Sequence, residues 1–248
     1  MKLIKNVMPK LKMPSFKVDI PLSKYLDDDA LLKYMNRSFC CIMVGKPASG
    51  KSSLLTGLLS TKTKFYQVFN KIYLFMPESS RNSMRGDPFK TIPDERKFEG
   101  VAYNDLTDVY EQMLKTSEKD EFTCLVLDDV QSYLKNGDVI KLLIHIIQNR
   151  RHLRCCIFIL VQNYKKIPLD IRSSCSDAFL FNVSKEEYKF IHEEIINASK
   201  KEFSEILQFY RKAKLENKHS FLYIHDFDTF FINWDSIVLD DEDSLETI

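Results

Sequence analysis

Glycine is scarce in this sequence, with six residues in 248, and several other signals are missing. No apolar run reaches the roughly 18 residues of a membrane-spanning helix, and the amino terminus lacks the hydrophobic stretch of a signal peptide. No C-x-x-C spacing occurs, which disfavours a zinc site. The net charge is only +1. This excludes a polycationic nucleic-acid coat, so any DNA contact must come from a local patch.

The length and composition predict one large α/β domain. Hydrophobic residues make up 44% of the chain, enough for a sizeable core. Most of the six cysteines lie in apolar, strand-like runs, where they suit packing better than a disulfide network; these are Cys40, Cys41, Cys124, Cys155 and Cys156. We therefore expect a reducing compartment such as the cytosol or the nucleus.

Both ends of the chain differ in composition from the middle. Residues 1–38 form a basic arm in which prolines argue against a regular element. The arm could contact nucleic acid or a neighbouring subunit, or it could be a solvated terminus. Residues 236–248 form an acidic tail that we expect to be disordered. The sequence thus predicts a domain over residues 39–235.

Within that domain, strand-like and helix-like segments alternate, which predicts a mainly parallel sheet covered by helices. The expected strands cover residues 39–44, 71–76, 122–127, 155–161 and 178–181. Helices are expected over 106–113 and over 138–148, the latter capped by Asp138. Residues 77–100 read as a long loop. Two helices opened by S-x-x-E capping boxes, at Ser184 and Ser199, and a hairpin over 220–233 complete the chain.

Residues 45–52 match G-x-x-x-x-G-K-[ST], the loop that wraps the phosphates of a nucleotide. A strand precedes it and a helix follows it, which is the context that the motif needs. Backbone amides and the helix amino terminus attract phosphate, Lys51 adds a cation, and the Ser52 hydroxyl is placed to bind Mg²⁺. The predicted nucleotide-binding residues are Gly45, Lys46, Pro47, Ala48, Ser49, Gly50, Lys51, Ser52 and Ser53.

A second group of polar residues follows later strands. Asp128 and Asp129 end the 122–127 strand; we expect Asp128 to hold Mg²⁺ and Asp129 to accept a proton from the attacking water. Gln162 ends the 155–161 strand. If that strand lies between the 39–44 and 122–127 strands, the Gln162 amide reaches the γ-phosphate. Alternatively, the acids and the amide merely end strands at the surface.

Arginines precede the 155–161 strand, at the end of the apolar helix. Arg151, ahead of Arg150, is a candidate arginine finger that completes a neighbouring subunit's site. Compensation of the helix dipole is an equally weighted alternative. Arg172 is a reserve candidate.

Several segments resemble the poxvirus-type genome-packaging ATPases of the FtsK–HerA superfamily of P-loop motors. The resemblance covers residues 39–182 and depends on GKPASGKSSLL, KIYLFMPES, CLVLDDV, RRH and LVQNYKKIPLDIRSS. It implies a RecA/ASCE-like P-loop NTPase fold and a homo-oligomeric ring, usually of six subunits, that drives double-stranded DNA into a preformed capsid. Such proteins occur in large DNA viruses of eukaryotes, virophages and related elements. In this sequence Asp129 stands where many motors have Glu, and no separate nuclease domain is evident.

The residues and the resemblance together predict an ATP-hydrolysing, Mg²⁺-dependent DNA translocase with catalytic residues Lys51, Asp129, Gln162 and Arg151. Capsid or portal-vertex proteins are candidate partners. The expected location is the host cytoplasm or a viral factory, with the virion as a further candidate. The alternative is a nucleotide-dependent switch or scaffold that binds ATP without moving DNA. A GTPase is disfavoured because no N-K-x-D motif occurs. Candidate DNA contacts are Lys165, Lys166, Arg81 and Arg85.

Overall fold

A computed structural model of the chain describes residues 2–4, 38–60, 68–82, 89 and 91–238. The strands of the described part are β1 (Lys2–Ile4), β2 (Cys40–Val44), β3 (Lys71–Phe75), β4 (Lys97–Phe98), β5 (Thr123–Asp128), β6 (Cys155–Val161), β7 (Asp177–Leu180), β8 (Leu222–His225), β9 (Thr229–Ile232) and β10 (Asp235–Val238). The helices are α2 (Lys51–Ser60), α3 (Glu78–Asn82), η3 (Asp94–Arg96), α4 (Tyr103–Ser117), α5 (Gly137–Gln148), η4 (Tyr164–Lys166), α6 (Leu169–Arg172), α7 (Lys185–Ile195) and α8 (Lys200–Glu216).

In the described part of the chain all strands join one sheet, in the order β1-β10-β9-β8-β7-β2-β6-β5-β3-β4. The strands from β7 to β4 are parallel. Strand β6 therefore lies between β2 and β5, which was the condition for Gln162 to reach the phosphates. Because the strands are parallel, their carboxyl ends share one edge of the sheet. The predicted α/β fold with a mainly parallel central sheet is confirmed.

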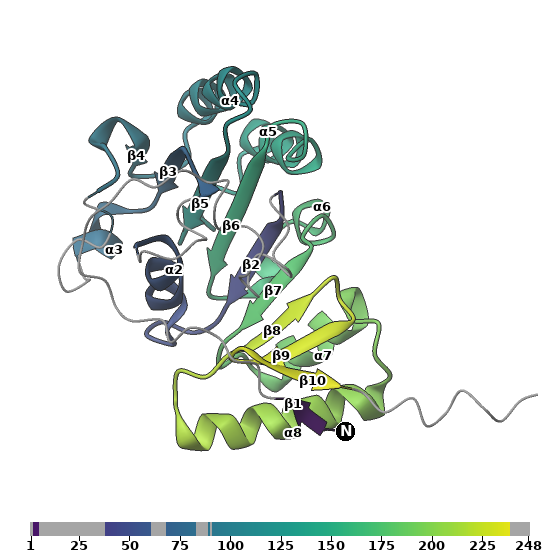
Figure 1. Cartoon of the computed structure of the whole chain (residues 1–248). Coiled ribbons are helices and arrows are strands. Elements are labelled where there is room, and N and C mark those ends of the chain that lie inside the picture. Colours follow the sequence, from purple (N-terminus) through teal and green to yellow (C-terminus); the bar gives the residue numbers. More distant parts are fainter. Residues whose placement is uncertain (1, 5–37, 61–67, 83–88, 90, 239–248) are drawn as a thin grey trace, which may run out of the picture.

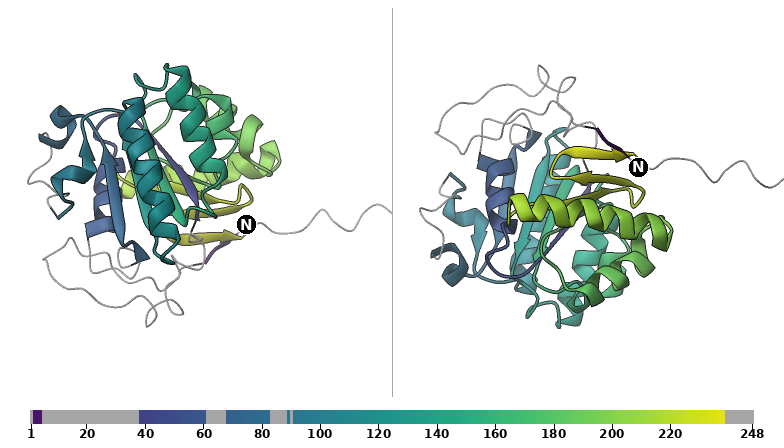
Figure 2. Two further views of the ribbon diagram at one scale, coloured as in Figure 1. Left: turned by 90° about the horizontal axis from the view of Figure 1, so that it is seen from above. Right: turned by 90° about the horizontal axis from the view of Figure 1, so that it is seen from below.

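The sheet separates two apolar clusters, because alternate strand residues face opposite sides. Cys40, Ile42 and Val44 pack with α4, α5, α6, α7 and α8, while Cys41 and Met43 pack with α2. Figure 1 and Figure 2 show α4 and α5 side by side over one face and α2 on the other. All six cysteines are buried free thiols, as expected for packing residues.

An antiparallel extension continues the sheet beyond β7. The expected hairpin is present as β8 and β9, and β10 and β1 follow on its outer side. The expectation that 1–38 contains no regular element is wrong for residues 2–4, since the prolines that argue against one come later, at 9–21. Residues 236–238, assigned to the tail, likewise belong to β10. The remaining tail and most of the arm lie outside the described residues.

Two predictions of helix caps need correction. Helix α5 is capped by Asn136 instead of Asp138, because Asn136 Oδ1 accepts hydrogen bonds from the amides of Asp138 and Val139 at 3.0 and 3.4 Å. The capping box at Ser199 is complete. At Ser184 only the serine caps its helix, since the Glu187 carboxylate accepts a hydrogen bond from the Tyr164 amide instead, at 2.8 Å.

The segment 77–100 contains α3, η3 and the short strand β4, although we expected a loop. Strand β4 forms because the Phe98 ring stacks on that of Phe75, with centroids 4.5 Å apart. The Phe98 carbonyl also accepts a hydrogen bond from the Met76 amide at 2.9 Å. No helix in the described ranges is long and apolar enough to span a membrane.

Candidate nucleotide-binding site

The loop between β2 and α2 turns sharply at the carboxyl edge of the sheet. The Gly45 amide donates to the Val161 carbonyl at 3.1 Å, which ties the loop to β6. Ala48 and Gly50 have φ of 58° and 111°, backbone conformations that lie in the left-handed region. Helix α2 then begins at Lys51, so its free amides face the loop. This arrangement can bind phosphate oxygens.

Gly45 is required by close packing. A Cβ atom at this position would lie 2.7 Å from both Phe181 Cβ and Ser49 Oγ. The Phe181 Cβ is fixed to the backbone next to β7, so it cannot move aside cheaply. The first glycine of the motif thus allows the loop to pass between β6 and the end of β7.

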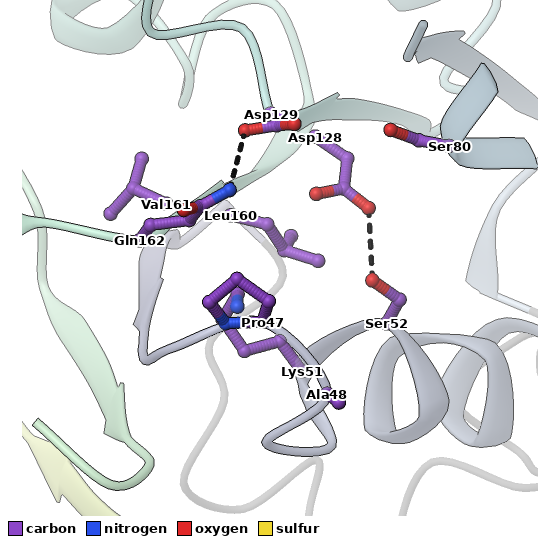
Figure 3. A pocket seen from close by; sticks show the side chains of 10 residues that line it. All are labelled: Pro47, Ala48, Lys51, Ser52, Ser80, Asp128, Asp129, Leu160, Val161 and Gln162. Carbon is purple, nitrogen blue, oxygen red and sulfur yellow. Dashed lines mark hydrogen bonds between the residues drawn. The ribbon is translucent and has the colours of Figure 1, made fainter. Parts of the chain in front are cut away.

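A cavity of about 180 Å³ lies above the loop. Its lining residues come from the loop, α2, α3 and the ends of β5 and β6 (Figure 3); they are Pro47, Ala48, Lys51, Ser52, Ser80, Asp128, Asp129, Leu160, Val161 and Gln162. Pockets for whole drug-sized ligands usually measure about 300–1,000 Å³. This cavity therefore suits a chain of phosphates better than a complete nucleotide.

Lys51 reaches back over the loop. Its Nζ donates to the carbonyls of Gly45 at 2.7 Å and Lys46 at 3.2 Å. Burial lowers the pKa of Lys51, while the charges of Asp128 and Asp129 oppose that shift. The ammonium group thus lies among carboxylates at the wall of the cavity, where it can pair with phosphate.

Ser52 and Asp128 form the candidate magnesium site. The Ser52 hydroxyl donates to Asp128 Oδ2 at 3.0 Å, so a hydroxyl and a carboxylate oxygen lie side by side (Figure 3). Mg²⁺ prefers oxygen ligands and commonly takes only one or two from protein, keeping water and phosphate for the rest. The two residues fit that requirement. Burial raises the pKa of Asp128 to about 6, and a bound cation would favour its ionised form.

Asp129 and Gln162 meet across the ends of β5 and β6. Gln162 Nε2 donates to Asp129 Oδ1 at 3.3 Å. Asp129 has φ of 53°, which turns it away from the strand direction of β5. Both side chains line the cavity. The tertiary structure thus brings together Lys51, Ser52, Asp128, Asp129 and Gln162.

The candidate arginines lie elsewhere. Arg151 is exposed in the turn before β6, at the opposite edge of the sheet from Gln162. A seven-residue strand separates the two edges by roughly 23 Å. Arg151 therefore cannot reach the phosphate loop of its own chain, and a catalytic role requires a second copy.

The other two arginines have intramolecular partners. Arg150 donates from Nε to the Ser38 carbonyl at 2.8 Å and from Nη1 to the Ile147 carbonyl at 2.9 Å. These bonds support the alternative role for Arg150, which is to stabilise the carboxyl end of α5. Arg172 is buried. Its Nη1 lies 3.2 Å from Glu194 Oε2, and its guanidinium group faces the Tyr164 ring. These contacts give both residues structural roles.

Two residues near the site were missed. Ser80 lines the cavity from α3, and His219 Nδ1 donates to the Ser49 carbonyl at 3.3 Å from the connection between α8 and β8. Ser80 follows the 71–76 strand and could have been noticed as a polar residue at the same sheet edge. His219 is 170 positions from Ser49, and no local pattern links the two.

Comparison with solved structures shows the same fold in viral proteins. B204, the DNA-packaging ATPase from Sulfolobus Turreted Icosahedral Virus, superimposes with a TM-score of 0.59 at 16% identity, covering 80% of this chain and 98% of that one. The packaging NTPase B204 of Sulfolobus turreted icosahedral virus 2 in complex with AMP has a TM-score of 0.52 at 15% identity, covering 80% and 98%.

A search of curated proteins finds no match. The family model described as "Poxvirus A32 protein" matches residues 28–248. This range includes the phosphate loop, both aspartates and Gln162, and it extends through the antiparallel extension into the acidic tail. The chain therefore belongs to the poxvirus A32 protein family, and the predicted resemblance is confirmed at the level of family and fold.

Proposed function

We propose that this protein is a Mg²⁺-dependent ATPase that translocates double-stranded DNA into a preformed viral capsid. One observation carries the proposal: five polar residues from the start of α2 and the ends of β5 and β6 line one cavity above a phosphate loop, namely Lys51, Ser52, Asp128, Asp129 and Gln162. One protein of the same fold is described as a DNA-packaging ATPase, and another as a genome packaging NTPase in complex with AMP.

The chain's own residues would divide the work as follows. The loop amides and Lys51 bind the β- and γ-phosphates. Ser52 and Asp128 hold Mg²⁺, which neutralises phosphate charge. Asp129 orients the attacking water and accepts its proton, while the Gln162 amide, already 3.3 Å from Asp129, detects the γ-phosphate and positions the carboxylate. Asp129 is one methylene shorter than glutamate, so its reach depends on the turned backbone at this residue.

Among the described residues that line the cavity, Lys51 is the single cation, so a further cation is needed for the charge that develops in the transition state. Arg151, exposed at the far edge of the sheet, supplies it from a neighbouring subunit. We therefore propose a homo-oligomeric ring of six subunits. Capsid or portal-vertex proteins would bind this ring. The ring acts in the host cytoplasm or a viral factory.

The central experiment measures the ATPase rate with and without duplex DNA. We expect DNA to stimulate hydrolysis, Lys51→Ala to abolish it, and Arg151→Ala to reduce it by about 10³-fold. Lys141→Ala, an exposed charge removal on α5, is the matched control and should retain the wild-type rate. The proposed motor function would be wrong if the protein were a monomer whose ATPase rate changed neither on addition of DNA nor on Arg151→Ala substitution.

DNA contact can be located by salt dependence. Lys165 and Lys166 follow β6 at the nucleotide edge, and both are exposed. Log affinity for DNA falls as log salt concentration rises, and removing each charge should make this negative slope shallower by about 1. Arg81 is a weaker candidate, because its Nε is buried, and Arg85 lies outside the described residues. An unchanged slope would remove Lys165 and Lys166 from the DNA interface.

The alternative function is a nucleotide-dependent switch or scaffold. It needs the phosphate loop but neither Gln162 nor an arginine from a second copy. Slow single-turnover hydrolysis together with tight, nucleotide-dependent binding of a partner protein would favour it over the motor.

A further inference from the structure

The two carboxylates and the amide that would face the γ-phosphate all come from one side of the loop. Asp128, Asp129 and Gln162 come from β5 and β6, and Gly45 is tied to β6 by its amide. The other side of the loop faces β7, because β2 lies between β6 and β7. Given the proposed function, the far end of a nucleotide must extend toward β7. The small cavity volume agrees, since it accommodates phosphates and leaves the nucleoside outside.

Two aromatic rings lie at that exit. A Cβ atom placed on Gly50 would be 3.5 Å from Phe181 Cε1 and 3.5 Å from His219 Nδ1. Phe181 directly follows β7, and His219 lies between α8 and β8. The hydrogen bond between His219 and the Ser49 carbonyl places the connection from α8 to β8 against the phosphate loop. Of the two rings, Phe181 is buried and His219 is exposed, so His219 has a free surface for a ligand.

The chain holds His219 in place on both sides. The His219 amide donates to Asn217 Oδ1 at 3.0 Å. The next residue, Ser220, is buried: its hydroxyl donates to the Ala213 carbonyl at 3.1 Å, and its carbonyl accepts from the Tyr210 hydroxyl at 3.2 Å. Such anchoring of an exposed ring reduces the entropy that a ligand would lose on binding.

Positive charge gathers at the same exit. Lys214, at the end of α8, donates to Asn182 Oδ1 at 2.5 Å. Burial lowers the pKa of Lys214, and the charge of Lys46 in the phosphate loop lowers it further. Two cations held this close would be stabilised by a phosphate between them. An imidazole ring beside such a pair can stack on a purine, and its Nε2 can accept a hydrogen bond from a ribose hydroxyl because Nδ1 is the donor to Ser49.

We propose that His219 forms the wall of a nucleoside subsite, where its ring contacts the base and ribose of a nucleotide whose phosphates occupy the loop. This proposal rests on the proposed function and adds a residue outside the motifs that carry the chemistry.

The test compares two ligands by isothermal titration calorimetry with Mg²⁺: ATP, and inorganic triphosphate, which lacks the nucleoside. We expect His219→Ala to weaken ATP binding about tenfold and to leave triphosphate binding unchanged. His219→Phe keeps a ring and should bind ATP nearly as well as the unaltered protein. Lys218→Ala, an exposed change in the same connection, should affect neither ligand.

Two results would overturn the subsite. His219→Ala could leave the ATP affinity unchanged, or it could weaken ATP and triphosphate by the same factor, which would mean that His219 only supports the loop through Ser49. If the unaltered protein bound neither ligand, the proposed function itself would fall, and the subsite with it.

Discussion

At the scale of single residues, the site is built from atoms that tolerate little change. Gly45 has no room for a side chain, whereas a Cβ on Gly57 in the middle of α2 would meet no atom of the described residues within 4 Å. The two glycines therefore make a matched pair in one loop-helix unit.

We expect Gly45→Ala to lower the free energy of unfolding by roughly 1–3 kcal/mol, because the new methyl group overlaps the Cβ of Phe181. Gly57→Ala should raise it by up to about 1 kcal/mol, since alanine loses less conformational entropy in a helix. Thermal unfolding monitored by circular dichroism measures both. Equal effects of the two substitutions would show that the contact with Phe181 is not decisive.

Asp128 provides a second prediction at this scale. Its pKa is 3.8 in an unfolded chain and about 6 in the fold. Between these pH values the folded protein holds more protons than the unfolded one, so the free energy of unfolding decreases as pH rises from 4 to 6. Asp128→Asn removes the buried charge and should stabilise the protein without Mg²⁺ or nucleotide at pH 7 by roughly 1–3 kcal/mol. The gain should vanish near pH 4.

Thermal melts at pH 4, 5, 6 and 7 test this directly. The same variant should lose ATPase activity, because it removes the proposed Mg²⁺ ligand. A gain in stability that is the same at pH 4 and at pH 7 would mean that burial of the carboxylate charge is not its cause.

At the scale of elements, the parallel core and the antiparallel extension are joined through one buried carboxylate. Asp177, at the start of β7, accepts hydrogen bonds from the Tyr223 hydroxyl at 2.6 Å, Ser176 Oγ at 2.7 Å and His225 Nδ1 at 2.9 Å. Tyr223 and His225 belong to β8. This network fixes the register of β8, the strand that follows α7 and α8, against β7.

Burial lowers the pKa of His225, but the hydrogen bond and charge of Asp177, with Asp226 and Asp228, raise it overall above the usual value of 6.5. The stabilisation is therefore complete below pH 6.5 and is lost as pH rises through the pKa of the folded state. We expect His225→Gln to destabilise the protein by about 1 kcal/mol at pH 6 and by less at pH 9. Denaturant unfolding at the two pH values measures this.

His152→Gln is the control, since His152 is exposed in the turn before β6. A loss of stability at His225 that is as large at pH 9 as at pH 6 would assign its role to packing and not to charge.

At the scale of the whole molecule, the sheet places Arg151 and the phosphate loop at opposite edges, so the proposed role of Arg151 in catalysis requires two copies of the chain. Complementation between variants tests this arrangement. Arg151→Ala keeps a phosphate loop, and Lys51→Ala keeps an arginine. Each variant alone should be inactive, and a mixture should regain activity at mixed interfaces.

With random assembly at equal amounts, about a quarter of the interfaces join an intact loop to an intact arginine, so we expect up to about a quarter of the wild-type rate. Mixing Arg151→Ala with Lys51→Ala/Arg151→Ala is the control and should restore nothing. Failure of the first mixture under conditions in which subunits exchange would remove Arg151 from the neighbouring site.

The sequence alone determined the local parts of this protein: the phosphate loop, the polar ends of the strands, the alternation of strands and helices and the capping box at Ser199. Each of these parts can be predicted from a short stretch of consecutive residues, because backbone conformation and the periodicity of side chains depend on near neighbours. Only the tertiary structure decided which parts meet. It inserted β6 between β2 and β5, which put Gln162 beside Asp129; it placed Arg151 at the far edge; and it brought His219 to the loop. These contacts depend on the order of strands in the sheet, and that order follows from the packing of the two apolar faces, which no short stretch of sequence contains.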